Sequence, residues 1–340
     1  MDAASFAEEL LAFWLRDHPE ISEWDCATAP VPAATDARWW NGGEELDQEL
    51  TRRYGDYLAA AAAVLEHQKG CARDTPDGER SELQRRLLEA EEHAAAAAVP
   101  AASLVGPRMA QLKELEARAP AIAHHRRRPM DLTAERRVIE QLLVPFAAEE
   151  GAEEWPETPA WVVKDGEPVE AARLVQTRQQ LALVVLLDQF SRNIHRGSPQ
   201  AFAYDRFAGP LAGMLLARRA HLQLAPFERF FLTMPLEHSE NPEQQELGVV
   251  ATTALMEHVQ QRDGFEGPTV KYFEEVTAAR SGRAELIKQF GRYPPRNEAL
   301  GRENTEAEAA YLAERQQALE AAEDDGKDAS SFIHVPTAKQ

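Results

Sequence analysis

Apolar residues recur along this chain at steps of three and four positions, which is the spacing of one face of a helix. Such runs cover residues 5–16, 44–68 and 133–148. No pair of segments shows the strict alternation of apolar and polar residues that is typical of half-buried strands. The pattern therefore predicts an all-α fold.

The residues from 181 to 187 are apolar on every helical face, so the helix that contains them is expected to be buried all round. Asp188 follows directly, and an ionised carboxylate at such depth is costly unless it has a partner. Arg192, one helical turn later, is the nearest candidate. This pair is either a structural ion pair that holds the helix against its neighbours or part of a polar site.

Capping residues mark three helix starts. Ser198 and Asn241 each precede a proline, which predicts a side-chain cap followed by proline at the first helical position. Gln244 stands three residues after Asn241, and Glu308 three residues after Thr305, which is the spacing of a capping box.

Composition divides the chain into four parts. Residues 1–68 hold the first helices, and residues 173–322 hold the buried helix and the polar residues that follow it. Between them, 69–172 is rich in Ala, Glu, Arg, Pro and Gly, which predicts an insertion with helices and loops of its own. The polar residues 323–340 are expected to form a flexible tail.

The formal net charge of −20 opposes binding to nucleic acid and to anionic membrane surfaces. One basic run, residues 124–128, is interpreted as a solvated loop or helix end. Cys26 and Cys71 lack the spacing of a zinc site. The longest apolar stretch is far shorter than the ~20 residues that cross a bilayer. Because the start of the chain also does not resemble a signal peptide, the cytoplasm is the expected compartment.

Polar side chains that could bind a ligand follow the buried helix. Asp188, Arg192 and Arg196 lie at four-residue steps and are expected to share one helix face, with Asn193 beside them. One carboxylate cannot saturate two guanidinium groups, so a purely structural role explains Arg196 less well than Arg192.

A second group, Glu237, His238 and Glu240, is expected to crowd a short turn before the helix that begins at Asn241. A histidine between two carboxylates suits general acid–base catalysis, because such neighbours raise its pKa. It also suits a metal ion, although the HxxxH spacing is missing. The structural alternative is that the glutamates pair with distant arginines while His238 caps or packs. We take His238, Glu240 and Asp188 as the candidate catalytic residues.

Three more arginines, Arg292, Arg296 and Arg302, surround a Pro-Pro break that forbids a continuing helix. Arginine is well suited to bidentate recognition of carboxylate and phosphate groups. Carboxylates could neutralise these side chains in a buried network. We expect partial neutralisation that leaves one or two guanidinium groups for an anion. The candidate ligand-binding residues are Arg192, Asn193, Arg196, Glu237, Arg292, Arg296, Asn297 and Arg302, and no metal ligand is assigned.

Three blocks, Leu186–Arg196, Pro235–Glu240 and Phe290–Asn297, resemble in this order the signature of the family catalogued as domain of unknown function 924 (DUF924). The resemblance covers roughly residues 5–68 and 173–315. It implies an all-helical fold, an antiparallel helix array similar to tetratricopeptide-repeat proteins, with a function that is not established and a cofactor that is unknown.

The chain also departs from the family pattern. Ser191 stands where the family usually has proline, and Arg283 and Pro295 stand where it commonly has histidine. The loss of two histidines weakens a histidine-based metal site and favours anion recognition by arginine.

Three functions agree with these observations. The first is an enzyme or binding protein for a small carboxylate or phosphate, which we rank ahead of the others. The second is a helical scaffold that binds a protein partner through residues 70–170. The third is a metal-dependent hydrolase that uses His238, Glu240 and Asp188.

Overall fold

The computed structural model describes residues 1–15, 43–74, 83–89, 132–147, 168–263 and 268–324. These residues are 86% helical and form no strand, which confirms the all-α prediction. The basic run at 124–128, Cys26 and the predicted tail from residue 325 onward lie outside them.

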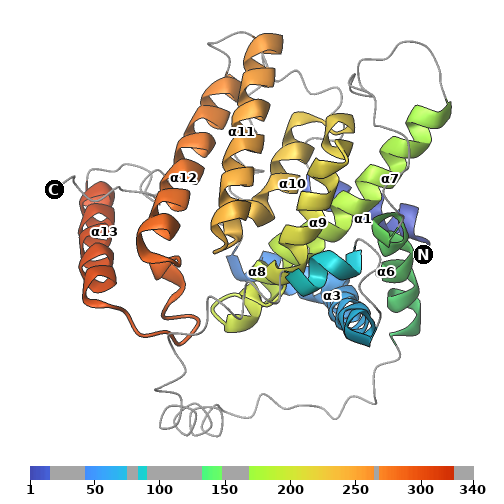
Figure 1. Ribbon diagram of the computed structural model, residues 1–340, viewed down its shortest axis with the longest axis horizontal. Coiled ribbons are helices and arrows are strands. Elements are labelled where there is room, and N and C mark those ends of the chain that lie inside the picture. Colours follow the sequence, from blue (N-terminus) through green and yellow to red (C-terminus); the bar gives the residue numbers. More distant parts are fainter. Residues whose placement is uncertain (16–42, 75–82, 90–131, 148–167, 264–267, 325–340) are drawn as a thin grey trace, which may run out of the picture.

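The N-terminal helices pack around the start of a central helix. α1 (Ala3–Trp14) lies against that helix, α7 (Pro168–Val185), and α3 (Gly43–Asp74) lies against α6 (Thr133–Ala147). α6 contacts α7 as well, so the four helices share one core (Figure 1).

Helix α6 falls inside the segment predicted to be an insertion. Its buried residues Val138, Ile139 and Leu142 nevertheless belong to the same apolar cluster as α1 and α7. This part of 69–172 is therefore a structural member of the main core, and the limits of an insertion stay a prediction.

The central helix changes its hydrogen-bonding register at its polar end. α7 continues into a π-helical turn, η3 (Leu186–Phe190), and then into the short helix α8 (Ser191–Ile194). Every residue from 181 to 187 is at most 1% exposed, as the apolar run predicted. Because α8 ends before it, Arg196 lies in the following turn, and the prediction that it shares one helix face with Asp188 is wrong.

Two short 3₁₀ turns connect the next helices. The turn η4 (Pro199–Phe202) leads into α9 (Asp205–Ala217), and η5 (Ala220–Gln223) follows it. Ser198 precedes η4, but its hydroxyl donates to the carbonyl of His195 instead of capping the turn.

Helix α10 (Pro226–His238) is buried along its whole length. It continues through Pro235, so Glu237 and His238 belong to its last turn and only Glu240 lies beyond it. The predicted short turn at Glu237 and His238 is therefore wrong. An interior proline lowers the stability of a helix by about 3 kcal/mol. Packing on every face of α10 offsets this loss.

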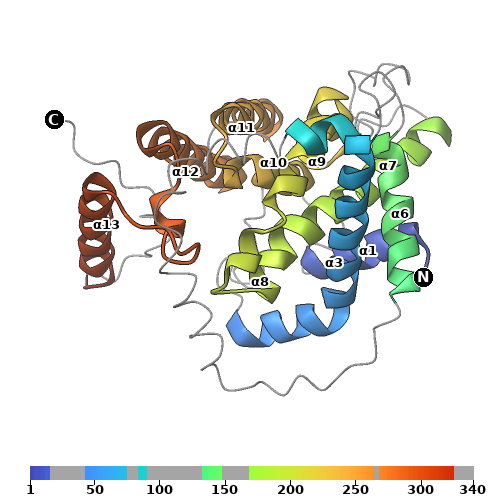
Figure 2. The same ribbon diagram turned by 60° about the horizontal axis from the view of Figure 1, so that its bottom comes forward.

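The C-terminal part begins with two long helices that lie side by side, α11 (Pro242–Asp263) and α12 (Pro268–Phe290) (Figure 1). The turn η6 (Pro294–Arg296) then leads to α13 (Glu306–Asp324), which lies beyond α12 at the edge of the molecule. Figure 2 shows α12 and α13 on the side opposite α6. A small separate cluster holds α13 in place, made of Leu286, Ile287, Tyr293 and Tyr311.

Two of the predicted caps have the expected geometry. Asn241 Oδ1 accepts from the amides of Glu243 and Gln244 at 2.8 and 3.1 Å. Thr305 and Glu308 form a reciprocal capping box, with distances of 2.7 and 3.2 Å. The capping box predicted for Gln244 is wrong, because the amide of Asn241 donates to a serine hydroxyl instead.

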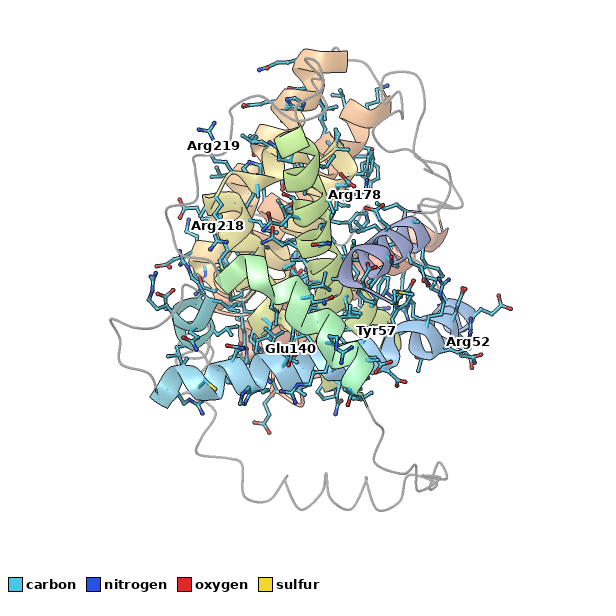
Figure 3. The ribbon with its side chains drawn as sticks, turned by 90° about the vertical axis from the view of Figure 1, so that its right-hand side faces the viewer. Arg52, Tyr57, Glu140, Arg178, Arg218 and Arg219 are labelled. Atoms are coloured by element: carbon cyan, nitrogen blue, oxygen red, sulfur yellow. The ribbon has the colours of Figure 1, made fainter. Side chains whose placement is uncertain are left out.

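Charged side chains lie apart from one another on this side of the molecule, where Figure 3 shows Arg178 on α7, Glu140 on α6 and Arg218 at the end of α9. None of the described helices combines the length and the apolar character needed to cross a bilayer.

Candidate functional site

The candidate site is built around Asp188, which lies in the middle of the π-helical turn and is 1% exposed. Such turns are rare and are frequent at functional sites. The Asp188 carboxylate lies 3.0 Å from an Arg192 nitrogen and accepts from Gln189 Nε2 at 2.5 Å. Burial raises the pKa of Asp188, but Arg192 and His238 outweigh burial and hold it below its usual range. The group is therefore a buried anion.

His238 ends α10 with its Nδ1 atom 2.8 and 3.0 Å from the two oxygens of Asp188. Since an ionised carboxylate only accepts hydrogen bonds, Nδ1 carries the proton. Nε2 makes no hydrogen bond to a described residue. Burial and the charge of Arg192 lower the pKa of His238, although Asp188 opposes them. Asp188 raises the pKa, as predicted for a carboxylate neighbour, but the net shift is downward, so the imidazole is neutral near pH 7.

Asp205, at the start of α9, joins two of the predicted arginines. Arg192 lies 2.8 Å from one of its oxygens, and Arg296 lies 3.2 Å from the other. The Arg296 guanidinium also lies 4.7 Å from the centre of the Phe202 ring. Burial lowers the pKa of Arg296, partly opposed by Asp205. It stays protonated near pH 7, as arginine does in proteins.

Glu237 pairs with two arginines of α12. Arg280 Nε lies 2.8 Å from its carboxylate, and an Arg283 nitrogen lies 3.6 Å away. Arg280 is 1% exposed and also donates to Thr233 Oγ1 at 2.6 Å. Arg280 thus fixes α12 to α10 from inside the protein.

Glu240 is fully engaged by other groups. Arg302 binds both of its oxygens at 2.7 and 2.8 Å, and the amide of Tyr293 donates to it at 2.9 Å. Burial raises the pKa of Glu240, but these partners outweigh burial and lower it. Glu240 therefore orients the turn after α12, and this geometry gives it no free oxygen for proton transfer.

Two predicted arginines point to partners outside this group. Arg196 makes bidentate hydrogen bonds to Asp47 at 2.6 and 3.0 Å and is half exposed. It also donates to Asn193 Oδ1 at 2.7 Å. Arg292 binds both oxygens of Glu308 at 2.6 and 2.7 Å. Arg196 and Arg292 therefore lie at the edge of the site and not at its centre.

Asn297, also predicted, is 0% exposed and donates to Asn304 Oδ1 at 2.8 Å. Its backbone carbonyl accepts from the amide of Arg302 at 2.7 Å. Asn297 thus shapes the turn that carries Arg296 and Arg302.

We call the central group the polar cluster. It has more guanidinium groups than carboxylates, five against four, among the residues described. Its neutral imidazole adds no charge, so one positive charge is uncompensated. Its members are Arg192, Arg280, Arg283, Arg296, Arg302, Asp188, Asp205, Glu237, Glu240 and His238.

Arg280 and Arg283 were missed as site residues by the sequence reasoning. They lie on a long helix where their spacing is that of ordinary charged positions. The only signal was that Arg283 replaces a histidine of the family pattern.

The described part of the chain contains no group of three or more His, Cys, Asp or Glu side chains placed to hold a metal ion. His238, Glu240 and Asp188 are all described, and their donors face each other or arginine. The geometry therefore gives no support to the metal-dependent hydrolase.

An apolar groove of about 460 Å³ lies apart from the polar cluster, between α9 and α11. Gly213, Leu236 and Val250 are among its lining residues, and Val250 is 60% exposed. None of the ten residues of the polar cluster lines this groove.

Comparisons with known proteins point to one family. The sequence profile described as "Bacterial protein of unknown function (DUF924)" matches residues 126–316, more than half of the chain. The match begins inside the segment predicted to be an insertion. No curated protein matches the chain.

A similar solved structure is titled "Structure of Protein of Unknown Function ATU0120 from Agrobacterium tumefaciens". It is 29% identical, and the match covers 43% of this chain and 73% of that chain with a TM-score of 0.31.

Proposed function

We propose that this chain, which belongs to the DUF924 family of bacterial proteins of unknown function, binds a small anionic molecule at the polar cluster and transfers a proton to or from it. The observation that carries the proposal is the buried Asp188–His238 pair within a group of arginines. The carboxylate fixes one tautomer of the imidazole, so that Nε2 is the atom able to accept a proton.

Electrostatics supports an anion as the ligand. The polar cluster has an excess of one positive charge inside a protein whose formal net charge is −20. Guanidinium groups bind carboxylate and phosphate through two parallel hydrogen bonds. A bound anion would also balance a charge that is otherwise costly to bury.

The chemistry that follows is general base catalysis by His238. A histidine with a lowered pKa is unprotonated near pH 7 and can accept a proton from a bound hydroxyl group or water. Asp188 would stabilise the imidazolium formed in that step. Arg192 and Arg296 would hold the anionic part of the ligand beside it.

The test is a thermal-denaturation screen against small carboxylates and phosphorylated metabolites at constant ionic strength. A ligand at one hundred times its dissociation constant adds about 2.7 kcal/mol of stability. We expect at least one compound to raise the midpoint of the wild-type protein and to have a smaller effect on Arg296→Gln. Arg136→Gln makes the same charge change on α6, where Arg136 pairs with Glu140, and should behave like the wild type.

Proton transfer is tested separately with His238→Asn. The asparagine amide can still donate to Asp188, but it cannot accept a proton as Nε2 does. We expect this variant to keep ligand binding and to lose any turnover of the compound identified. If no compound in the screen distinguishes wild type from Arg296→Gln, the proposal is wrong.

A further inference from the structure

Arg283 is the arginine of the polar cluster with the least saturated guanidinium group. Its nearest carboxylate is Glu237, at 3.6 Å, whereas Arg280 approaches the same carboxylate to 2.8 Å. No hydrogen bond joins Arg283 to a described residue, and its buried Nε–H has no partner. The other four arginines of the cluster each have a carboxylate within 3.2 Å.

The position of the Arg283 side chain favours a planar ligand group. Its guanidinium carbon lies 4.6 Å from the centre of the Tyr293 ring. A guanidinium over an aromatic face keeps its N–H groups available along its edge. Two adjacent N–H groups along that edge match the two oxygens of a carboxylate.

The charge of the polar cluster limits the charge of the ligand. With five guanidinium groups against four carboxylates and a neutral imidazole, a monoanion balances the described cluster. A phosphate monoester carries about 1.5 to 2 negative charges near pH 7 and would leave a buried excess. Such an excess is costly away from water.

We propose that Arg283 binds the anionic group directly and that the ligand is a small monocarboxylate. This inference rests on the function proposed above and narrows its ligand class. Arg283 then acts as the specificity-determining residue, while His238 faces the remainder of the ligand.

The test is an NMR titration of the full-length protein with sodium lactate, sodium benzoate and inorganic phosphate at constant ionic strength. We expect at least one of the two carboxylates to bind more tightly than phosphate. Arg283→Gln should weaken that binding by about tenfold or more, since the positive charge and the pair of parallel N–H groups are both lost. Arg283→Lys keeps the charge but not the paired N–H groups, so its affinity should lie between those of the wild type and Arg283→Gln. Arg136→Gln is the control for net charge and should leave binding unchanged.

A second variant changes the net charge of the polar cluster and leaves Arg283 in place. Glu237→Gln removes one negative charge with little change in shape and should raise the excess to two positive charges. We expect phosphate to gain affinity relative to the carboxylate by about tenfold in this variant. Circular dichroism and thermal denaturation establish that each variant is folded. If Arg283→Gln does not fold, the comparison of the wild type with Arg283→Lys tests the role of Arg283.

Each outcome decides between the two proposals. If neither carboxylate nor phosphate binds and the wider metabolite screen is also negative, the proposed function fails and this inference fails with it. If phosphate binds more tightly than both carboxylates, the proposed function stands and the ligand class is wrong. If a carboxylate binds equally to wild type and Arg283→Gln, the role of Arg283 is wrong.

Discussion

The Nδ1 atom of His238 lies 2.8 Å from Oδ1 of Asp188, although 50 positions separate the two residues in the chain. The contact joins the π-helical turn after α7 to the last turn of α10. It therefore fixes the relative position of two buried helices and the tautomer of the imidazole at the same time.

Replacement of Asp188 by asparagine should destabilise the protein strongly. The variant keeps the shape of the side chain but removes the charge that Arg192 and His238 contact. Breaking one side of a buried ion pair costs about 3–5 kcal/mol. Urea denaturation measures this loss, and Asp56→Asn, an exposed position on α3, should change stability by less than about 0.5 kcal/mol. Equal effects of the two substitutions would contradict a buried charged network.

The Asp188–Arg192 ion pair could be predicted from sequence, because its determinants are local. The apolar run before Asp188 predicted its burial, and the four-residue spacing predicted Arg192 as a partner. The caps at Asn241 and Thr305 were likewise predictable from neighbouring residues.

The rest of the site depends on contacts between distant parts of the chain. Arg196 pairs with Asp47, which lies 149 positions away, and no local pattern indicates this partner. A π-helical turn differs from an α-helix only in hydrogen-bonding register, so the sequence at Leu186–Phe190 did not reveal it. Arg280 occupies an ordinary helical position, and only tertiary packing makes it 1% exposed.

Stability should fall in mildly acidic solution because two histidines, the partly buried His221 and the buried His238, have lowered pKa values. Burial and the charge of Arg229 lower the pKa of His221 to about 4, and the pKa of His238 is lowered as well. Below the ordinary histidine value the unfolded chain binds protons that the folded protein does not bind. The free energy of unfolding therefore decreases as pH falls from about 6.5 toward 4, by up to about 1.4 kcal/mol per pH unit for each histidine.

The variant His221→Gln separates this effect from acid titration of carboxylates. Glutamine can replace the hydrogen bond to the carbonyl of Leu215 and does not titrate. We expect urea denaturation between pH 7 and 4.5 to show a shallower loss of stability for the variant than for the wild type. Parallel pH profiles would mean that His221 titrates normally in the folded protein.

Glu308 should hold the turn that carries Arg296 and Arg302. Its carboxylate binds Arg292 through both oxygens and caps α13 at Thr305. The hydrogen bond from Arg292 lowers the pKa of Glu308 to about 2, against the opposing effect of burial. This contribution to stability is complete above the unfolded pKa and is lost as pH falls toward 2.

Substitution of Glu308 by glutamine should cost about 2 kcal/mol, the magnitude of hydrogen bonds to charged groups. Hydrogen exchange should also become faster at the amides of Arg302 and Thr305. Glu306→Gln, an exposed residue of the same helical turn, is the matched control and should leave exchange at these amides nearly unchanged. Slow exchange retained in Glu308→Gln would show that other contacts hold this turn.

The contact between α10 and α11 should tolerate no additional methyl group at Gly248. A Cβ atom there would lie 3.2 Å from Leu236 Cβ and 3.5 Å from the amide nitrogen of Glu237. The helices would have to separate, which typically costs 1–3 kcal/mol in a packed core. Because Glu237 and His238 follow Leu236 directly, the same shift should disturb the polar cluster.

Gly213→Ala is the control, since nothing lies within 4 Å of its added Cβ. It should stabilise α9 by up to about 1 kcal/mol, as alanine does over glycine inside a helix. Thermal denaturation should thus move in opposite directions for the two variants. A Gly248→Ala midpoint at or above the wild-type value would mean that the two helices adjust at no cost.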